Sequence, residues 1–475
     1  MKRSTKAQLR LEEPVCRSSP RAFLAGIGLK VRQLKLFSPI EDRVKIAQKS
    51  VDYTPLNKLY EGFIAILAGA QGLVEINKRL RSDAGLQLAF GLEGCAEQSV
   101  VQETLNACTA ENVDQMQAAI DVIYRCYSQA YHHDYQQRWQ LLDVDMSGMP
   151  CGKKAAFATK GYFAKQRNRR GRQLGRVLAT HYDEVVVDLL FDGKTQLVQA
   201  FIPLIQAAAQ TLEMTGEAGE AKRKRTILRM DSGGGSVEDI NWALAQGYQI
   251  HGKDYSGKRA KVLAESVTQW FEDPKHSDRQ VGLVPLSCEE YLYPIHRIAV
   301  RCRKKNGQWG VGVLLSSLTA ETVLSLTQQS LDEESFNDPT QLLKTVLMAY
   351  VYFYDQRGGG VETSLKQDKQ GVGLTKRTKK RFEAQQIVVQ LSTLAHNVIV
   401  WAKGWLAPYT PKIRRFGILR MVRDVFTMSG LLFIQSDKTI IEIRLNQADA
   451  LARKFISGLS ALLSSEQVAV NLGQT

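Results

Sequence analysis

Three acidic residues of this chain stand where carboxylates could assemble a metal site. Asp145 and Asp231 each follow a short apolar run, and Glu362 comes just after three consecutive glycines. If the aspartates lie on strands and the glutamate on a helix, their carboxylate oxygens could hold two divalent ions about 3.5–4 Å apart, as phosphodiester chemistry requires. Magnesium accepts hard oxygen ligands and keeps several waters, so a few carboxylates suffice. The sequence therefore predicts a phosphodiester site with these three residues as metal ligands.

Each acid also has an ordinary interpretation. Asp143 lies two residues before Asp145, and both could be exposed residues of one strand; we prefer Asp145 because it lies nearer the strand end. The segment Asp231–Gly235 could be a simple turn. Glu362 by itself could be a solvated helix residue. Basic residues at fixed spacings around Glu362 favour a site over these alternatives.

A short window around Glu362 is the most specific part of the predicted site. It also contains Tyr354, Arg357 and Lys369. If a helix begins near the glycines, Glu362 and Lys369 lie seven residues apart and share one helical face. That face would offer a carboxylate to a metal and cations to phosphate groups.

The elements that must position these residues alternate between strand and helix. Apolar runs predict strands, and helical spacing predicts helices between them, in the order strand 141–146, strand 177–191, helix 195–212, strand 226–231 and helix 236–246. This order is typical of an α/β nuclease core. Later strands around the turn Asn306-Gly307 predict a β-rich insertion, since Asn-Gly supports a tight hairpin.

The whole chain is expected to contain six segments. In order, they are a basic arm, an N-terminal helical DNA-binding region similar to a helix-turn-helix, the first part of the core, the insertion, the second part of the core and a C-terminal region, covering 1–45, 46–138, 139–247, 248–338, 339–412 and 413–475. The N-terminal helices could equally form a plain helical bundle. A hairpin over 430–445 and a helix over 449–463 are expected near the C-terminus.

The charge of the chain favours a polyanionic partner. Its 475 residues carry a formal net charge of +15, and the sequence pI is about 9.4. Nucleic acid is the first candidate and an anionic membrane surface the second. No apolar run approaches the roughly 18 residues of a spanning helix, and no apolar stretch follows the basic N-terminus. We therefore expect a cytoplasmic, nucleoid-associated protein.

Cysteine and histidine do not suggest a zinc site or a disulfide framework. The seven cysteines are odd in number and include no Cys-X-X-Cys pair, which fits a reducing compartment. His132 and His133 are adjacent, so their side chains point in different directions on a helix or a strand. A solvated pair is the better interpretation of these histidines.

Two basic segments are candidates for DNA contact. The first, 160–176, interleaves cations with Tyr162 and Phe163 just after the first acidic strand. Arginine binds phosphates bidentately, and such contacts give affinity without reading sequence. The alternative is a solvated loop. A second patch, 376–381, follows the Glu362 helix. The residues of the first segment expected to bind DNA are Lys165, Arg167, Arg169, Arg170 and Arg172.

The window around Glu362 resembles a motif of bacterial insertion-sequence transposases, in the cut-and-paste group with an Asp-Asp-Glu triad and a Tyr-Arg-Glu-Lys signature. That signature has two, three and six residues between its members. Here the gaps are two, four and six, and the extra residue falls among Gly358–Gly360, where a loop could absorb it. The resemblance covers roughly residues 56–465.

The two aspartates carry the rest of the resemblance. The segment Leu141–Gly148 is similar to the family's first-acid segment. Around the second acid, Asp231 and Gly233 match the family pattern, whereas Ser236 replaces an aromatic residue.

The resemblance implies a ribonuclease-H-like core with a β-rich insertion between the second Asp and the Glu. It implies that the triad binds Mg²⁺, with Mn²⁺ also possible, and that Tyr354, Arg357 and Lys369 contact phosphates at the transposon end. In relatives, a tryptophan of the insertion stacks on a displaced base. Trp270 and Trp309 lie in that region, although a core tryptophan is the commoner case.

The function implied is that of a DNA transposase. It would bind double-stranded DNA at terminal inverted repeats, cut there, and join the freed ends to target DNA as a homodimer in a synaptic complex. The alternatives are a non-catalytic DNA-binding regulator or inactive copy, and a ribonuclease-H-like nuclease of another kind. The retained triad argues against the first, and the Tyr354–Lys369 window argues against the second.

Overall fold

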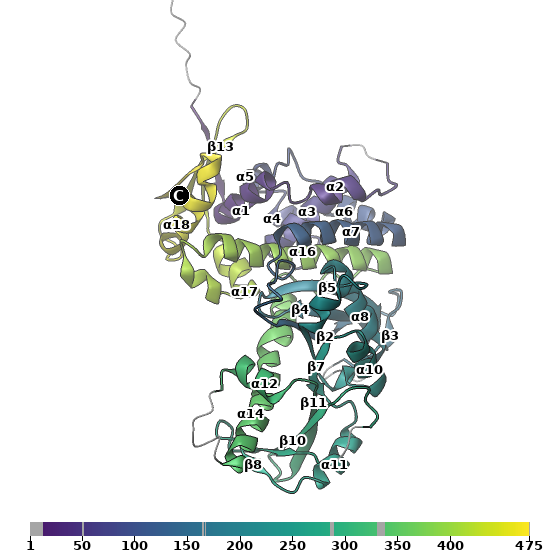
Figure 1. The fold of residues 1–475 in the computed structure, drawn as a ribbon. Coiled ribbons are helices and arrows are strands. Elements are labelled where there is room, and N and C mark those ends of the chain that lie inside the picture. The colour runs from purple at the N-terminus through teal and green to yellow at the C-terminus, as the bar shows by residue number, and fades with distance from the viewer. Residues whose placement is uncertain are drawn as a thin grey trace, which may run out of the picture. The chain divides into compact units, whose positions relative to one another are not determined.

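The structure is a computed structural model that describes residues 13–49, 52–163, 166, 168–285, 289–329 and 338–474. The chain divides into two compact units. We call Tyr124–Lys366 the central unit, and Met1–Ile123 together with Gln367–Thr475 the terminal unit. Each contains helices and a sheet, so the fold is mixed α/β (Figure 1). All three predicted acids lie in the central unit.

The central unit is built on a mixed sheet that has ten strands within the described residues. In one half the order is β5–β4–β2–β6–β7. Strand β4 pairs antiparallel with β2 and β5, and β6 pairs parallel with β2 and β7. The short β3 also pairs with β4. The bounds are Gln140–Pro150 (β2), Thr159–Lys160 (β3), Arg170–Ala179 (β4), Glu184–Asp192 (β5), Thr226–Met230 (β6) and Gln249–Lys253 (β7).

Strand β2 lies in the middle of this half, which explains its apolar run. Leu141, Leu142 and Val144 are at most 4% exposed, as expected for a strand covered on both faces. Helix α8 (Leu197–Thr211) packs against β4 and β5, and α10 (Val237–Ala245) packs against β7. The two predicted helices of the core are thereby confirmed. The short α9 (Glu220–Lys224) precedes β6.

The other half of the sheet is antiparallel and continues from β7 in the order β11–β10–β9–β8. The predicted hairpin is confirmed, because Arg303 pairs with Trp309 across the turn and Gly307 has a φ of +79°. The remaining elements are α11 (Gly257–Glu265), β8 (Phe271–Glu272), β9 (Arg279–Leu283), β10 (His296–Arg303), β11 (Trp309–Ser316) and α12 (Ala320–Thr327).

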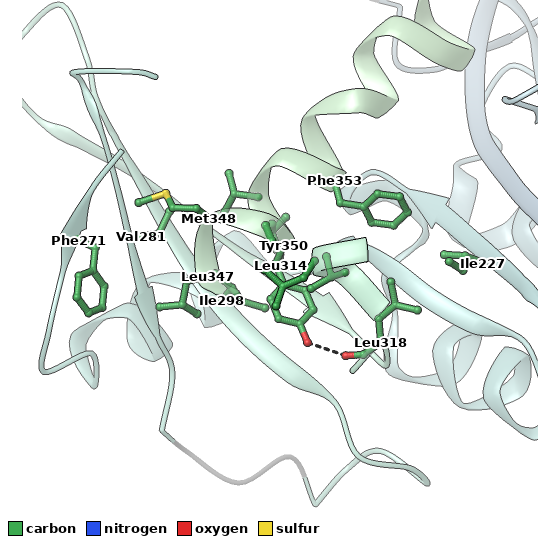
Figure 2. Packing of buried hydrophobic residues seen from close by; sticks show 14 of the residues in the cluster. Ile227, Phe271, Val281, Ile298, Leu314, Leu318, Leu347, Met348, Tyr350 and Phe353 are labelled. Atoms are coloured by element: carbon green, nitrogen blue, oxygen red, sulfur yellow. Dashed lines mark hydrogen bonds between the residues drawn. The ribbon is translucent and has the colours of Figure 1, made fainter. Parts of the chain in front are cut away.

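Helix α14 (Pro339–Arg357) packs on this antiparallel half and carries the first residues of the signature window. Its Leu347, Tyr350 and Phe353 belong to a buried cluster with residues of β9, β10 and β11 (Figure 2). The hydroxyl of Tyr350 donates to the carbonyl of Leu318 at 2.6 Å. This core fixes the end of α14, from which Tyr354 and Arg357 project.

The terminal unit combines helices with a four-stranded sheet of order β1–β12–β13–β14. The predicted C-terminal hairpin is confirmed as β12 and β13, and the helix predicted over 449–463 is confirmed as α18. The strands are β1 (Val15–Ser19), β12 (Gly430–Ile434), β13 (Ile440–Asn446) and β14 (Ala469–Gly473); the helices include α1 (Ala22–Gln33), α2 (Ser38–Arg43), α3 (Pro55–Leu67), α4 (Glu75–Arg79), α5 (Ala84–Ala89), α6 (Gln98–Ala107), α7 (Ala110–Tyr127), α16 (Phe382–Leu406), α17 (Ile418–Arg420) and α18 (Ala452–Leu463).

The basic arm predicted over 1–45 needs correction in its described part. Residues 1–12 lie outside the described residues. After them, β1 pairs antiparallel with β12, and Phe23, Leu24 and Ile27 of α1 are fully buried. The segment is therefore part of the core of the terminal unit, since its apolar residues pack there although its composition is basic.

No helix in the described part of the chain combines the length and the apolar character needed to cross a membrane.

Replacing Tyr350 by Phe should lower the free energy of unfolding by about 1 kcal/mol, because the buried hydrogen bond to Leu318 is lost without a change in shape. Urea denaturation measures the difference. Tyr255, which is 51% exposed, provides the matched control, and Tyr255→Phe should leave stability unchanged. Equal effects of the two substitutions would contradict this account of the core.

Candidate active site

The two aspartates lie where the parallel pairing of two neighbouring strands ends, although β2 itself continues alongside β4 to Pro150 and is longer than the predicted strand 141–146. Strand β2 pairs with β6 in a register that ends with Val144 opposite Met230, the last residue of β6. Asp145 and Asp231 are the next residues on each chain segment. In open α/β sheets, ligands bind beyond the carboxyl ends of parallel strands. The backbone register thus places both predicted acids at one edge.

A tight turn holds Asp231 at this edge. Its carboxylate accepts a hydrogen bond from the Gly233 amide at 2.8 Å and caps the 3₁₀ turn Ser232–Gly234 (η1). A Cβ at Gly235 would lie 2.3 Å from the Lys253 carbonyl oxygen, so only glycine fits beside β7. Ser236 then caps α10 by accepting from the Asp239 amide. The glycines therefore allow the backbone to pack closely against β7. The segment is a turn, as the alternative interpretation had it, and this turn also positions Asp231.

The glycines before Glu362 form a π-helical turn, Gly358–Glu362 (η2), between α14 and α15 (Thr363–Gln370). The extra residue of the signature is absorbed here within a helix, which corrects the predicted loop. A π turn accommodates one added residue in an otherwise continuous helix, and such turns are frequent at functional sites. Gly360 leaves helical geometry, with φ −90° and ψ −110°.

Gly360 also lies against the sheet. A Cβ at this position would come within 2.5 Å of Asp143 Oδ2 and 3.0 Å of Thr180 Cγ2. The turn η2 contacts β2 and β4 through this close approach. A larger residue at position 360 would push Glu362 away from the part of β2 that carries Asp145.

Arg357 joins two of the three acids. Its Nη1 lies 2.9 Å from Glu362 Oε1, and its Nη2 lies 3.4 Å from Asp145 Oδ2. The same Nη2 donates to the Val144 carbonyl at 3.0 Å. The side chain of Arg357 is only 3% exposed, whereas that of Glu362 is 58% exposed. One guanidinium thus ties the π turn to the middle of β2.

The charges of the window act on one another. Burial raises the pKa of Asp145 to about 6; Arg357 opposes this shift, while Asp231 and Glu362 add to it. Burial likewise raises the pKa of Tyr354 to about 12; Arg357 lowers it and the three acids raise it. The structure therefore brings Tyr354, Arg357 and the three acids into one electrostatic cluster.

Asp143, the alternative to Asp145, is engaged elsewhere. Arg229 of β6 binds it through two hydrogen bonds of 2.6 and 3.0 Å, and both side chains are fully buried. Arg229 also donates to the Phe353 carbonyl at 3.0 Å. Asp143 is therefore a structural residue of the sheet, while Asp145, on the same face of β2, has a side chain that is 16% exposed.

The sequence analysis missed two buried arginines that support the site. One is Arg229; the other is Arg176 of β4, which lies opposite Asp145 in the strand register. Arg176 binds Asp188 at 2.7 and 2.8 Å and donates to the Ser364 hydroxyl at 2.8 Å. A charged residue inside an apolar strand requires a buried partner, and the run Thr226–Met230 contained that indication.

The donor set matches a hard divalent cation in type, since all three acids supply carboxylate oxygens. Within the described residues, however, no group of three or more His, Cys, Asp or Glu side chains is arranged to hold a metal ion. Arg357 contacts the oxygens of Asp145 and Glu362 instead. The residues thus fit a metal in their chemistry, and Arg357 supplies the positive charge in this arrangement.

The other predicted DNA contacts fall into four groups. Lys165 and Arg167 lie outside the described residues, and Lys369 belongs to the terminal unit. Arg169 and Arg170 are exposed. Arg172 requires a correction, because it is 1% exposed and its Nε donates to the Ala156 carbonyl at 2.8 Å. Its charge supports β4 and is not available at the surface.

The two tryptophans of the predicted insertion already stack on arginine. The guanidinium of Arg301 lies 4.1 Å from the ring centre of Trp270 and 4.7 Å from that of Trp309. Arg303 also lies 5.4 Å from the Trp309 ring centre. These cation–π contacts account for both rings within the protein.

Comparisons with known proteins add little. No protein-family model matches the chain, and no curated protein matches it significantly. The chain is similar to a solved structure described as the piggyBac transposase synaptic complex with hairpin DNA, with 12% identity and a TM-score of 0.39 over 86% of this chain and 81% of that one. At that TM-score the likeness carries no argument, so any functional conclusion rests on the residues of this chain.

The neighbouring aspartates should differ sharply in their effect on stability. Asp143→Asn leaves Arg229 buried without its charged partner and should lower the free energy of unfolding by about 3–5 kcal/mol. Asp145→Asn is the matched control and should not lower stability, because it removes a charge that burial disfavours. Urea denaturation compares the two. Equal losses would show that Asp145 is also structural.

The raised pKa of Asp145 predicts a pH dependence of stability. The folded protein holds this proton more tightly than the unfolded chain, so the carboxyl stabilises the fold below the unfolded pKa of about 3.9. That contribution is lost as the pH rises through about 6. The free energy of unfolding of the wild type should therefore decline relative to Asp145→Asn between about pH 4 and pH 7. Parallel pH profiles for the two proteins would contradict the shift.

Proposed function

We propose that this chain is a DNA transposase that cuts at the terminal inverted repeats of its element and transfers the freed ends to target DNA. The observation that carries the proposal is the electrostatic cluster of Asp145, Asp231 and Glu362 with Arg357 and Tyr354. Two of the acids directly follow the parallel β2–β6 pairing, and the third lies on the π turn. Carboxylates from three separate elements that influence one another's charge suit chemistry on a phosphodiester.

We assign the half-sheet β5–β4–β2–β6–β7 to the ribonuclease-H-like core that the resemblance implies. The antiparallel half β11–β10–β9–β8 corresponds to the β-rich insertion between Asp231 and Glu362. The position of the two aspartates just beyond the parallel β2–β6 pairing supports this assignment, because ligands of such sheets usually bind beyond the carboxyl ends of parallel strands. We also propose that the N-terminal helices bind DNA in a manner similar to a helix-turn-helix.

Asp145, Asp231 and Glu362 would hold Mg²⁺, or Mn²⁺ in its place. When bound, two such ions activate the attacking oxygen and stabilise the leaving oxygen. The side chain of Glu362 is exposed, so its carboxylate would leave Arg357 and bind the metal instead. Proton release on metal binding is expected at about pH 6 and below, because the pKa of Asp145 is about 6.

The remaining residues of the window would bind DNA. Tyr354 stays protonated at neutral pH, since its pKa is about 12, and can donate a hydrogen bond to a phosphate oxygen. Arg357 would neutralise phosphate charge, and Lys369 would contact the transposon end. Exposed Arg169 and Arg170 would bind the backbone nearby. The formal charge of +15 supports a DNA partner, and we propose a homodimer in the synaptic complex within the nucleoid.

A non-catalytic DNA-binding regulator is the second candidate function. The observation in its favour is that Arg357 contacts two of the three acids in this arrangement. A protein that had lost catalysis could keep that ion pair permanently and still bind DNA through its basic surfaces.

Cleavage of a DNA fragment carrying the inverted repeats that flank the gene tests the proposal. Wild type should nick the repeat boundary in the presence of Mg²⁺, and Asp231→Ala or Glu362→Gln should abolish nicking while DNA binding remains. Glu265→Gln is the matched control, because this exposed residue of α11 lies outside the cluster. Specific binding by the wild type without metal-dependent cleavage would favour the regulator instead.

A further inference from the structure

A groove opens in the central unit beside the edge of β11. Its volume is about 980 Å³, and it is lined by residues of α11, the β10–β11 hairpin and the end of α14. The lining residues used below are Lys253, Lys258, Lys261, Lys304, Trp309 and Tyr354. Neither the triad nor the predicted basic segments include any of the four lysines.

Glycines of β11 make room for two of the lysines. A Cβ at Gly310 would lie 2.9 Å from Cε of Lys304, and one at Gly312 would lie 2.9 Å from Cε of Lys253. The alkyl stems of both lysines therefore rest against the strand, with their ammonium groups at the groove. Since long cationic side chains often lay their stems on a surface in this way, the heads stay hydrated and accessible.

The positive charge of this groove is not compensated by the protein. No ion pair joins Lys253, Lys258, Lys261 or Lys304 to an acid within the described residues. The lining also contains Asp355, which Arg279 binds at 2.7 Å while the same guanidinium binds Asp273 at 2.6 Å. Four ammonium groups therefore surround one concave surface that contains a single carboxylate. Isolated exposed lysines are ordinary, whereas four around one groove with one acid favour an anionic ligand.

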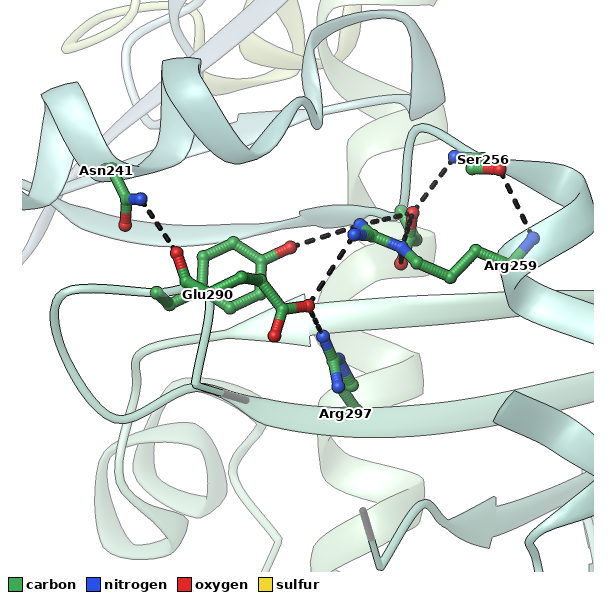
Figure 3. A network of polar contacts seen from close by, with 7 residues as sticks. Asn241, Ser256, Arg259, Glu290 and Arg297 are labelled. Atoms are coloured by element: carbon green, nitrogen blue, oxygen red, sulfur yellow. Dashed lines mark hydrogen bonds and ion pairs between the residues drawn. The ribbon is translucent and has the colours of Figure 1, made fainter. Parts of the chain in front are cut away.

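The wall that carries two of these lysines is fixed by a polar network (Figure 3). Ser256 caps α11 by accepting from the Arg259 amide at 3.2 Å. The Arg259 guanidinium binds Asp254 at 2.8 Å and the Tyr291 hydroxyl at 3.2 Å. Glu290 pairs with Arg297 and accepts from Asn241 through its carbonyl at 2.9 Å. Lys258 and Lys261 thus project from a helix that is held in place before any ligand arrives, which lowers the cost of binding.

The groove leads to the candidate active site. Tyr354 belongs to the groove lining and also to the electrostatic cluster with Asp145, Asp231 and Glu362. Trp309 lies in the same lining on β11. A ligand bound along the lysines would therefore have one end next to the acids.

We propose that this groove binds the sugar-phosphate backbone of a single DNA strand that continues from the candidate active site. The inference rests on the proposed function. A single strand can enter a groove between a helix and a strand edge, whereas a duplex about 20 Å wide would meet only its rim. Lysines that follow the backbone, together with aromatic rings, are the usual features of single-strand binding.

Binding of a fluorescein-labelled 20-nucleotide oligo(dT) to the full chain, followed by anisotropy, tests the groove. Lys258→Ala/Lys261→Ala should weaken binding on the order of tenfold at moderate salt, and reduce the slope of log K against log salt by about 1.4, since each lost single-strand contact contributes about 0.7. Binding of a 20-base-pair duplex should change less. Lys275→Ala/Lys305→Ala, which removes two exposed lysines outside the lining, should bind both as the wild type does.

A second pair of variants guards against misfolding of the first. Lys304→Ala should weaken oligo(dT) binding, whereas Lys305→Ala, one residue further in the same hairpin turn, should not. The proposal is overturned if the groove variants bind oligo(dT) as the wild type does, if single strand and duplex lose affinity equally, or if the wild type binds no oligo(dT). Cleavage separates the two proposals: metal-dependent nicking with an unimportant groove refutes only the groove, and oligo(dT) binding without nicking refutes only the transposase.

Discussion

The buried ion pair between Asp143 and Arg229 is the interaction on which the candidate site depends. It joins β2 to β6, and the same guanidinium reaches the Phe353 carbonyl at the end of α14. These are the elements that bear Asp145, that lead to Asp231, and that precede Glu362. Gly360 closes over the pair, because nothing larger fits beside Asp143. One buried charge pair thus sets the relative positions of three exposed or partly exposed acids.

Charge inside this unit follows a consistent division. Asp143–Arg229 and Arg176–Asp188 are side chains fully or almost fully removed from water and bound to each other. Breaking such pairs is costly, so they hold strands in register and leave little charge for ligands. The charges that remain available lie at the rim: Glu362, the exposed arginines after β3, and the lysines of the groove. Arg357 has features of both classes, because its side chain is buried while its guanidinium contacts both Asp145 and the exposed Glu362.

Much of this arrangement could be predicted from sequence because local patterns determine it. Apolar runs located the strand that carries Asp145 and the strand that leads to Asp231, although the first continues to Pro150, and Asn306-Gly307 located the hairpin. The pairings of distant segments could not be predicted, because the partners of Arg229 and Arg176 come from other strands and from the helices α14 and α15. The pairing of β1 with β12 is similar, since the two strands lie about 400 residues apart in sequence and no local pattern reveals such a contact. Burial of Arg172 was missed for the same reason.

The π turn at Gly358–Glu362 has a consequence for how this helix can vary in length. One residue inserted into a regular α-helix rotates everything beyond it by about 100°. Here Gly360 leaves helical geometry, so the chain kinks between α14 and α15 and the two helices do not share one angular phase. The Tyr354–Arg357 half of the window and the helix that starts after Glu362 are therefore uncoupled in register. A chain built in this way tolerates a change of one residue between an arginine and its acid without turning the acid out of the site.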